Sequence, residues 1–97
     1  MDKLAAARET FRRAARQPLS PELDLDAIDF ADLDPLALRA AVCYYRLAAD
    51  ETPETDGDRR LAATIRRLEA EERFATLAGR RFNLHDDFVG LPDVPAG

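Results

Sequence analysis

The amino-acid sequence predicts an all-α fold, a compact domain of three helices. Three segments place apolar side chains three or four positions apart, which is the spacing that lines one face of a helix, and Pro, Gly or a capping residue bounds each segment. The chain has 97 residues, enough for one domain and one hydrophobic core. Its composition, 46% hydrophobic and 34% charged, excludes the disordered and low-complexity classes.

The first helix is predicted over residues 2–17. Glu9 precedes Arg13 by four positions, the order that favours an ion pair along a helix. Pro18 cannot continue a helix and is expected to end this one. The side chains expected on its apolar face are Leu4, Ala7, Phe11, Ala14 and Ala15.

Residues 18–34 carry six acids and no base, together with several large apolar side chains. Ser20 followed by Pro21 is a helix-start signal, so we expect a short acidic helix over residues 21–32. Two roles stay open for its apolar side chains: packing onto this chain's own basic helices, or docking into a partner's groove with a basic rim. The candidate partner-binding residues of this segment are Leu23, Ile28, Phe30 and Leu33.

The second helix is predicted over residues 35–50. Asp34 followed by Pro35 supplies a cap and a first helical residue. Apolar side chains surround nearly the whole circumference, interrupted by Arg39 and Arg46 on one side. A helix of this kind is buried on most sides, so we expect it to be the central element.

A polar connection, residues 51–58, leads to the third helix, predicted over residues 58–78 and ended by Gly79. Its apolar residues occupy two roughly opposite sides, one with Leu61, Ile65 and Leu68, the other with Ala63, Ala70, Phe74 and Leu77. We expect Phe74 and Leu77 to face a partner or a second copy of the chain. The alternatives are a bend near residues 69–72, or a C-terminal tail folded over the second face.

The tail, residues 80–97, is too rich in Pro and Gly for a regular helix and too apolar for a free end, so it is expected to pack down. It contains His85, the single histidine, which is the first place to look for acid–base or metal chemistry. A zinc site needs three or four ligands, and the acidic segment lacks the glycine and closing Glu of a calcium loop. We therefore expect no metal, no cofactor and no catalytic residue.

Two further residue groups in the second helix have a possible chemical role. Cys43 lacks a nearby base in sequence and is expected to be a small buried side chain. Tyr44 and Tyr45 point about 100° apart on a helix, so the two rings cannot be equally buried, and they are the candidate lining of a small-ligand site. Gly-rich phosphate loops and catalytic triad spacings are absent, so the sequence does not indicate an enzyme.

The net charge of −5 weighs against a nucleic-acid-binding protein. Residues 59–82 nevertheless carry seven arginines against three glutamates, and the candidate basic contacts are Arg59, Arg60, Arg66 and Arg67. No ladder of aromatic residues accompanies them, as single-strand binding would require. The sequence therefore weighs against nucleic acid as a partner.

These observations predict a small cytoplasmic protein that binds another protein and has no activity of its own: an accessory or regulatory subunit, an adaptor or an antitoxin-like inhibitor. The sequence shows neither a membrane span nor a secretory signal. Two alternatives stay open, an acidic inhibitor that mimics nucleic acid and a small subunit of a nucleoprotein complex that uses the arginines. A homodimer is also left open.

Overall fold

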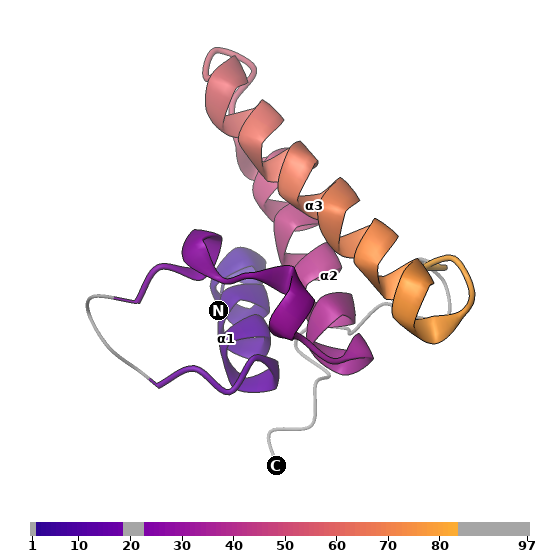
Figure 1. Ribbon diagram of the computed structural model, residues 1–97. Coiled ribbons are helices and arrows are strands. Elements are labelled where there is room, and N and C mark those ends of the chain that lie inside the picture. Colours follow the sequence, from indigo (N-terminus) through magenta and orange to yellow (C-terminus); the bar gives the residue numbers. More distant parts are fainter. Residues whose placement is uncertain (1, 19–22, 84–97) are drawn as a thin grey trace.

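The computed structural model describes residues 2–18 and 23–83. It contains three α-helices and two single 3₁₀ turns in the order α1 (Lys3–Ala14), η1 (Leu25–Ala27), η2 (Phe30–Asp32), α2 (Pro35–Glu51) and α3 (Gly57–Ala78). α2 and α3 form a long antiparallel hairpin, and α1 packs beside the N-terminal half of α2 (Figure 1). The predicted all-α, three-helix fold is confirmed.

α2 is the central element, as predicted, and its bounds agree with the prediction to within one residue. The Asp34 carboxylate accepts a hydrogen bond from the Ala37 N–H at 2.8 Å and caps the helix. Val42 and Leu38 are completely buried, and Phe11 of α1 and Phe74 of α3 pack into the same core. Cys43 is buried as expected. Because both neighbouring helices pack on α2, most of its apolar surface is buried within the chain, and Leu36 in its first turn remains exposed.

α1 ends at Ala14, earlier than the predicted end at residue 17. Arg16 adopts a left-handed conformation with φ 59°, and the N–H groups of Arg16 and Gln17 turn back to the carbonyls of Arg13 and Arg12, both at 3.0 Å. This closure satisfies the last carbonyls before Pro18 is reached. The chain therefore turns away from the helix two residues ahead of the proline.

The acidic helix predicted over residues 21–32 is not formed in the described part of that segment, which contains η1 and η2 instead. The carboxylates of Asp24 and Asp29 accept hydrogen bonds from the N–H groups of Asp26 and Ala31, at 3.0 and 2.9 Å. Aspartate side chains bound to the backbone in this way compete with helical hydrogen bonds. The regular spacing of the aspartates therefore produces two capped turns in place of one helix.

α3 is one unbroken helix, without the bend considered from the sequence, and Gly79 ends it in the left-handed conformation at φ 72°. The segment that follows packs back, because the ring of Phe82 lies edge-on to Phe74 with centroids 5.8 Å apart. Residues 84–97, including His85, lie outside the described residues, and the packing predicted for most of the tail falls on these residues. Among the described helices, none combines the length and hydrophobicity that a bilayer-spanning helix requires.

Candidate partner-binding surface

The structure encloses several of the residues predicted to bind a partner. Phe30, Leu33 and Phe74 are buried in this chain's own core, and Leu23 and Ile28 are half-buried against it. The acidic segment is thus packed on the helices by its apolar side chains, which is the first of the two roles considered for it. A partner does not reach Phe30, Leu33 or Phe74 in this conformation. Leu77 remains exposed.

The other apolar side of α3 is the one that faces solvent. Leu61, Ile65 and Leu68 are 58%, 46% and 51% exposed, although they are large aliphatic side chains on successive turns of one helix. Their spacing of four and then three residues aligns them along one stripe. We call these three residues the α3 seam. Single exposed leucines are common, whereas an aligned set is typical of a helix that binds another helix.

The seam leads into a hollow at the C-terminal half of α3. The hollow has a volume of about 380 Å³, and its apolar lining includes Leu68, Ala75 and Phe82. Glu71, Glu72 and Arg81 complete the lining. Phe82 reaches this position because Gly79 turns the chain back after the helix. The seam is therefore continuous with a concave site that suits a bulky apolar side chain of a partner.

The arginines of α3 lie on the sides of the helix away from the seam. Arg66, the most engaged of them, donates hydrogen bonds through Nη2 to the carbonyls of Leu25 and Ile28, at 3.2 and 3.0 Å. Its guanidinium lies 3.8 Å from the centre of the Phe30 ring. Arg73 donates to the carbonyl of Ala31 at 3.4 Å. These arginines hold the two acidic turns against α3.

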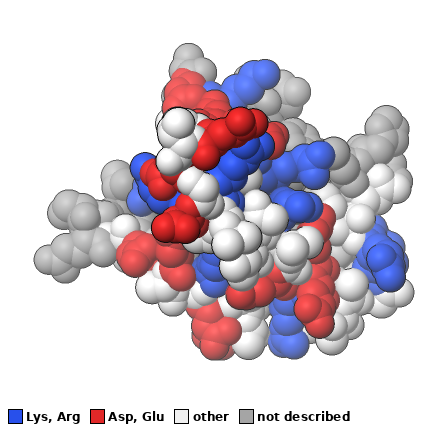
Figure 2. Space-filling model, turned by 90° about the horizontal axis from the view of Figure 1, so that it is seen from above, with Lys and Arg blue, Asp and Glu red and all other residues white. Residues whose placement is uncertain are grey.

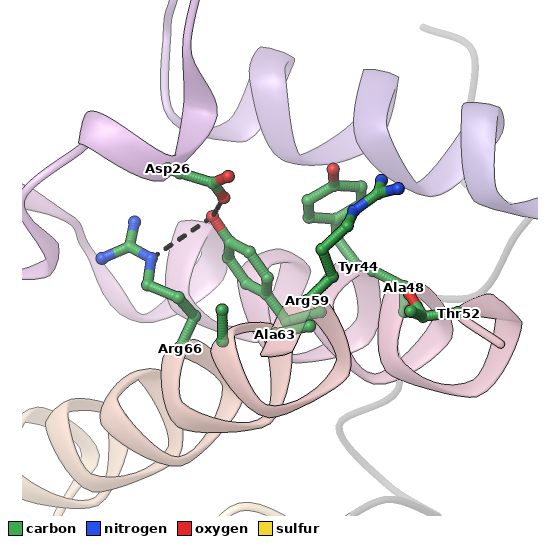
Figure 3. Close-up of a pocket in the computed structure, with 9 residues that line it drawn as sticks. Asp26, Tyr44, Ala48, Thr52, Arg59, Ala63 and Arg66 are labelled. Carbon is green, nitrogen blue, oxygen red and sulfur yellow. Dashed lines mark hydrogen bonds between the residues drawn. The ribbon is translucent and has the colours of Figure 1, made fainter. Parts of the chain in front are cut away.

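Arg66 also forms a hydrogen bond with Tyr45. The Arg66 Nε–H donates to the Tyr45 hydroxyl at 3.4 Å, and that hydroxyl lies 2.6 Å from the Asp26 carboxylate, to which it donates (Figure 3). Residues from α3, α2 and η1 thus meet in one polar network at the edge of the core. Arg66, predicted as a basic contact for a partner, is a structural residue here.

The remaining predicted basic contacts are partly engaged in ion pairs. Arg67 pairs with Glu71 at 3.2 Å, Arg59 with Asp56 at 3.5 Å and Arg60 with Glu54 at 3.8 Å. Figure 2 shows acidic and basic side chains adjoining one another on the face of the molecule seen from above. Each of these three arginines therefore has an acidic partner within the chain.

A second concave site lies beside Tyr44 and Tyr45. Its volume is about 340 Å³, and Ala48, Ala63 and Arg59 are among its lining residues (Figure 3). The Tyr45 hydroxyl is already held by the network described above. Tyr44 packs its ring against Tyr45 and Phe11, with centroids 4.9 and 5.9 Å apart. Both tyrosines therefore have structural partners, which accounts for their adjacent positions without a ligand.

Burial raises the pKa of both tyrosines above the ordinary value of 10.0, with a larger increase for Tyr45. For Tyr45 the hydrogen bond to Asp26 adds to the effect, because a phenolate beside a carboxylate is disfavoured. A raised pKa means that the fold favours the neutral phenol. The stability contributed by these groups is present below pH 10.0 and is lost as the pH rises through their folded-state pKa values.

The chain contains only these two tyrosines, so tyrosinate absorbance reports on them alone. We expect the folded protein to titrate above pH 10.0 and the chain in guanidinium chloride to titrate near it, with helical circular dichroism falling as the phenolates form. Tyr44→Phe and Tyr45→Phe show how much of the absorbance change belongs to each ring. Phenols that ionise at or below pH 10.0 in a chain still helical would contradict this expectation.

Within residues 2–18 and 23–83, no group of three or more His, Cys, Asp or Glu side chains is placed to hold a metal ion. Comparison with protein-family models, with curated proteins and with solved structures gave no match. Function is therefore inferred from the chain's own residues, and the seam with its adjoining hollow is the strongest candidate site.

The sequence did align the seam residues, but it did not tell which side of α3 faces outward. The distribution of charge is a signal that distinguishes the two sides. Arginines flank the side with Ala70 and Phe74, where the acidic turns pack. The charged residues on the side of Leu61, Ile65 and Leu68 are all acids. Pairing the Arg-bearing side with the acidic segment would have placed Phe74 in the core.

Proposed function

We propose that this chain acts by binding another protein through the α3 seam, without chemistry of its own, as an accessory subunit, an adaptor or an inhibitor. The observation that carries the proposal is the exposure of Leu61, Ile65 and Leu68 on a helix whose opposite side is already packed. Burying these side chains in an interface removes apolar surface from water, which favours association. The hollow beside Phe82 offers a site for an anchoring side chain.

The exposed seam contributes little to the fold, which makes it suited to mutational tests. We expect Leu61→Glu with Leu68→Glu to change the free energy of unfolding by no more than about 1 kcal/mol, because neither side chain is in the core. The same double change should weaken partner binding by at least about 2 kcal/mol, since it places two charges in a contact that excludes water. Chemical denaturation and a binding titration with the partner measure the two effects.

Photo-crosslinking in the native cell identifies that partner. A benzophenone amino acid replaces Ile65, and a matched control carries it at Leu36, which is 54% exposed on α2 and off the seam. The proposal is supported if the crosslinker at position 65 gives one dominant adduct, formed with a different protein. That adduct should be lost in the Leu61→Glu, Leu68→Glu variant and kept in the Leu36→Glu variant. Adducts that are equal from both positions, or that persist in the seam variant, would overturn it.

A further inference from the structure

The charged residues in and beside the α3 seam are all acids. The spacing of the seam continues from Leu68 to Glu72 and Ala75, and it extends back from Leu61 to Asp58. Glu69 and Glu71 flank it on its two sides. Among the described residues, neither Asp58 nor Glu72 makes an ion pair. Glu71 is paired with Arg67 at 3.2 Å, and Glu69 lies 3.9 Å from Arg66.

A second copy of the chain is a poor occupant of this surface. In two α3 helices packed seam to seam, either parallel or antiparallel, Asp58 and Glu72 enter the contact layer and the flanking positions offer only acids or neutral residues. No arginine of α3 occupies a position within or next to the seam. Arg81 lines the hollow, but it belongs to the segment after the helix and is a single base against the acids of each copy. Like charges across a helix pair disfavour that pairing.

We infer that the occupant of the α3 seam is an amphipathic helix of a different protein, with an apolar stripe flanked by lysines or arginines. This inference rests on the proposed function and adds the chemistry of the partner. Its apolar stripe covers Leu61, Ile65 and Leu68, and one large side chain enters the hollow beside Phe82. Its basic flanks face Asp58 and Glu72, for which the described residues supply no ion-pair partner, and neighbouring Glu69. Charge complementarity selects this helix over a second copy.

Two synthetic helical peptides of about three heptads test the inference, because they share one leucine stripe and differ only in flanking Lys or Glu. We expect the Lys-flanked peptide to bind the full chain at least about tenfold more tightly by fluorescence anisotropy, with the difference shrinking as salt is added. Glu69→Lys with Glu72→Lys should reverse the preference. The unliganded chain should sediment as a monomer.

The seam variant separates specific binding from general attraction to an acidic protein. Leu61→Glu with Leu68→Glu makes the chain more negative, so non-specific attraction of the Lys-flanked peptide would increase, whereas binding at the seam would fall. Equal binding of the two peptides, lost in the seam variant, would overturn the charge preference and leave the proposed function intact. Lys-flanked binding that is absent, or unchanged in the seam variant, would overturn the inference. So would a wild-type dimer that the seam variant dissociates.

Discussion

Replacing Val42 with Asp should unfold the whole chain. Val42 lies in the middle of α2 and is completely buried, with α1 on one side of the helix and α3 on another. A carboxylate there would be buried without a partner, which costs several kcal/mol, and natural domains have only about 5–15 kcal/mol of stability in total. A chain of this size is expected near the lower end of that range. Far-UV circular dichroism and thermal denaturation should show loss of helix with no cooperative transition.

Leu36→Asp is the matched control for that experiment. It introduces the same charge into the same helix, but Leu36 is exposed and lies in the first turn. A negative charge in the first turn interacts favourably with the helix dipole and stabilises the helix. We expect this variant to stay folded, with a Tm close to that of the wild type. If Val42→Asp also kept its cooperative transition, α2 would not be the centre of the core.

The central helix was predictable because one physical effect determines it. Asp34 and Pro35 mark its start, and the apolar residues that follow leave few positions for solvent on any side. Such a pattern has only one low-energy solution in a small domain, which is burial between other helices. Predicting the bounds of α2 and its central place therefore required no knowledge of a particular contact distant in the sequence.

The acidic segment and the orientation of α3 depended on competing or distant contacts. The carboxylates of Asp24 and Asp29 bind the backbone locally, so helical spacing of Leu23, Ala27, Phe30 and Ala31 did not produce a helix. In α3 both sides are apolar, and periodicity alone assigns neither to the core. Hydrogen bonds from Arg66 to carbonyls about 40 residues away resolve that choice. Sequence patterning thus identified both stripes of α3 but not which of them was available to a partner.

Arg66→Ala should be the most destabilising change among the predicted basic contacts. It removes a hydrogen bond to each of the carbonyls of Leu25 and Ile28, and it leaves the Phe30 ring without the guanidinium that covers it. The Leu25 carbonyl still accepts from the Tyr45 hydroxyl and the Ile28 N–H, so the Ile28 carbonyl is the one that loses its donor. Hydrogen bonds from charged groups contribute about 1.5–3 kcal/mol, and the Ile28 carbonyl, left without its donor, adds to the loss. We expect a loss of about 3 kcal/mol, which lowers the Tm of a domain of this size by roughly 15 °C. Calorimetry or denaturant titration measures it.

Arg59→Ala provides the comparison, because the side chain of Arg59 is 79% exposed whereas that of Arg66 is 19% exposed. Its ion pair with Asp56 is at the surface, so removal should cost less than about 1 kcal/mol. Arg66→Lys should fall between the two, since lysine keeps the charge but cannot donate to Tyr45 and two carbonyls in one planar fork. Equal stabilities of Arg66→Ala and Arg59→Ala would contradict the structural role of Arg66.

That structural role also determines how nucleic-acid binding should be tested in this chain. Loss of binding on changing Arg66 would reflect a destabilised fold, whereas changes at Arg59 and Arg60 alter surface charge in an intact fold.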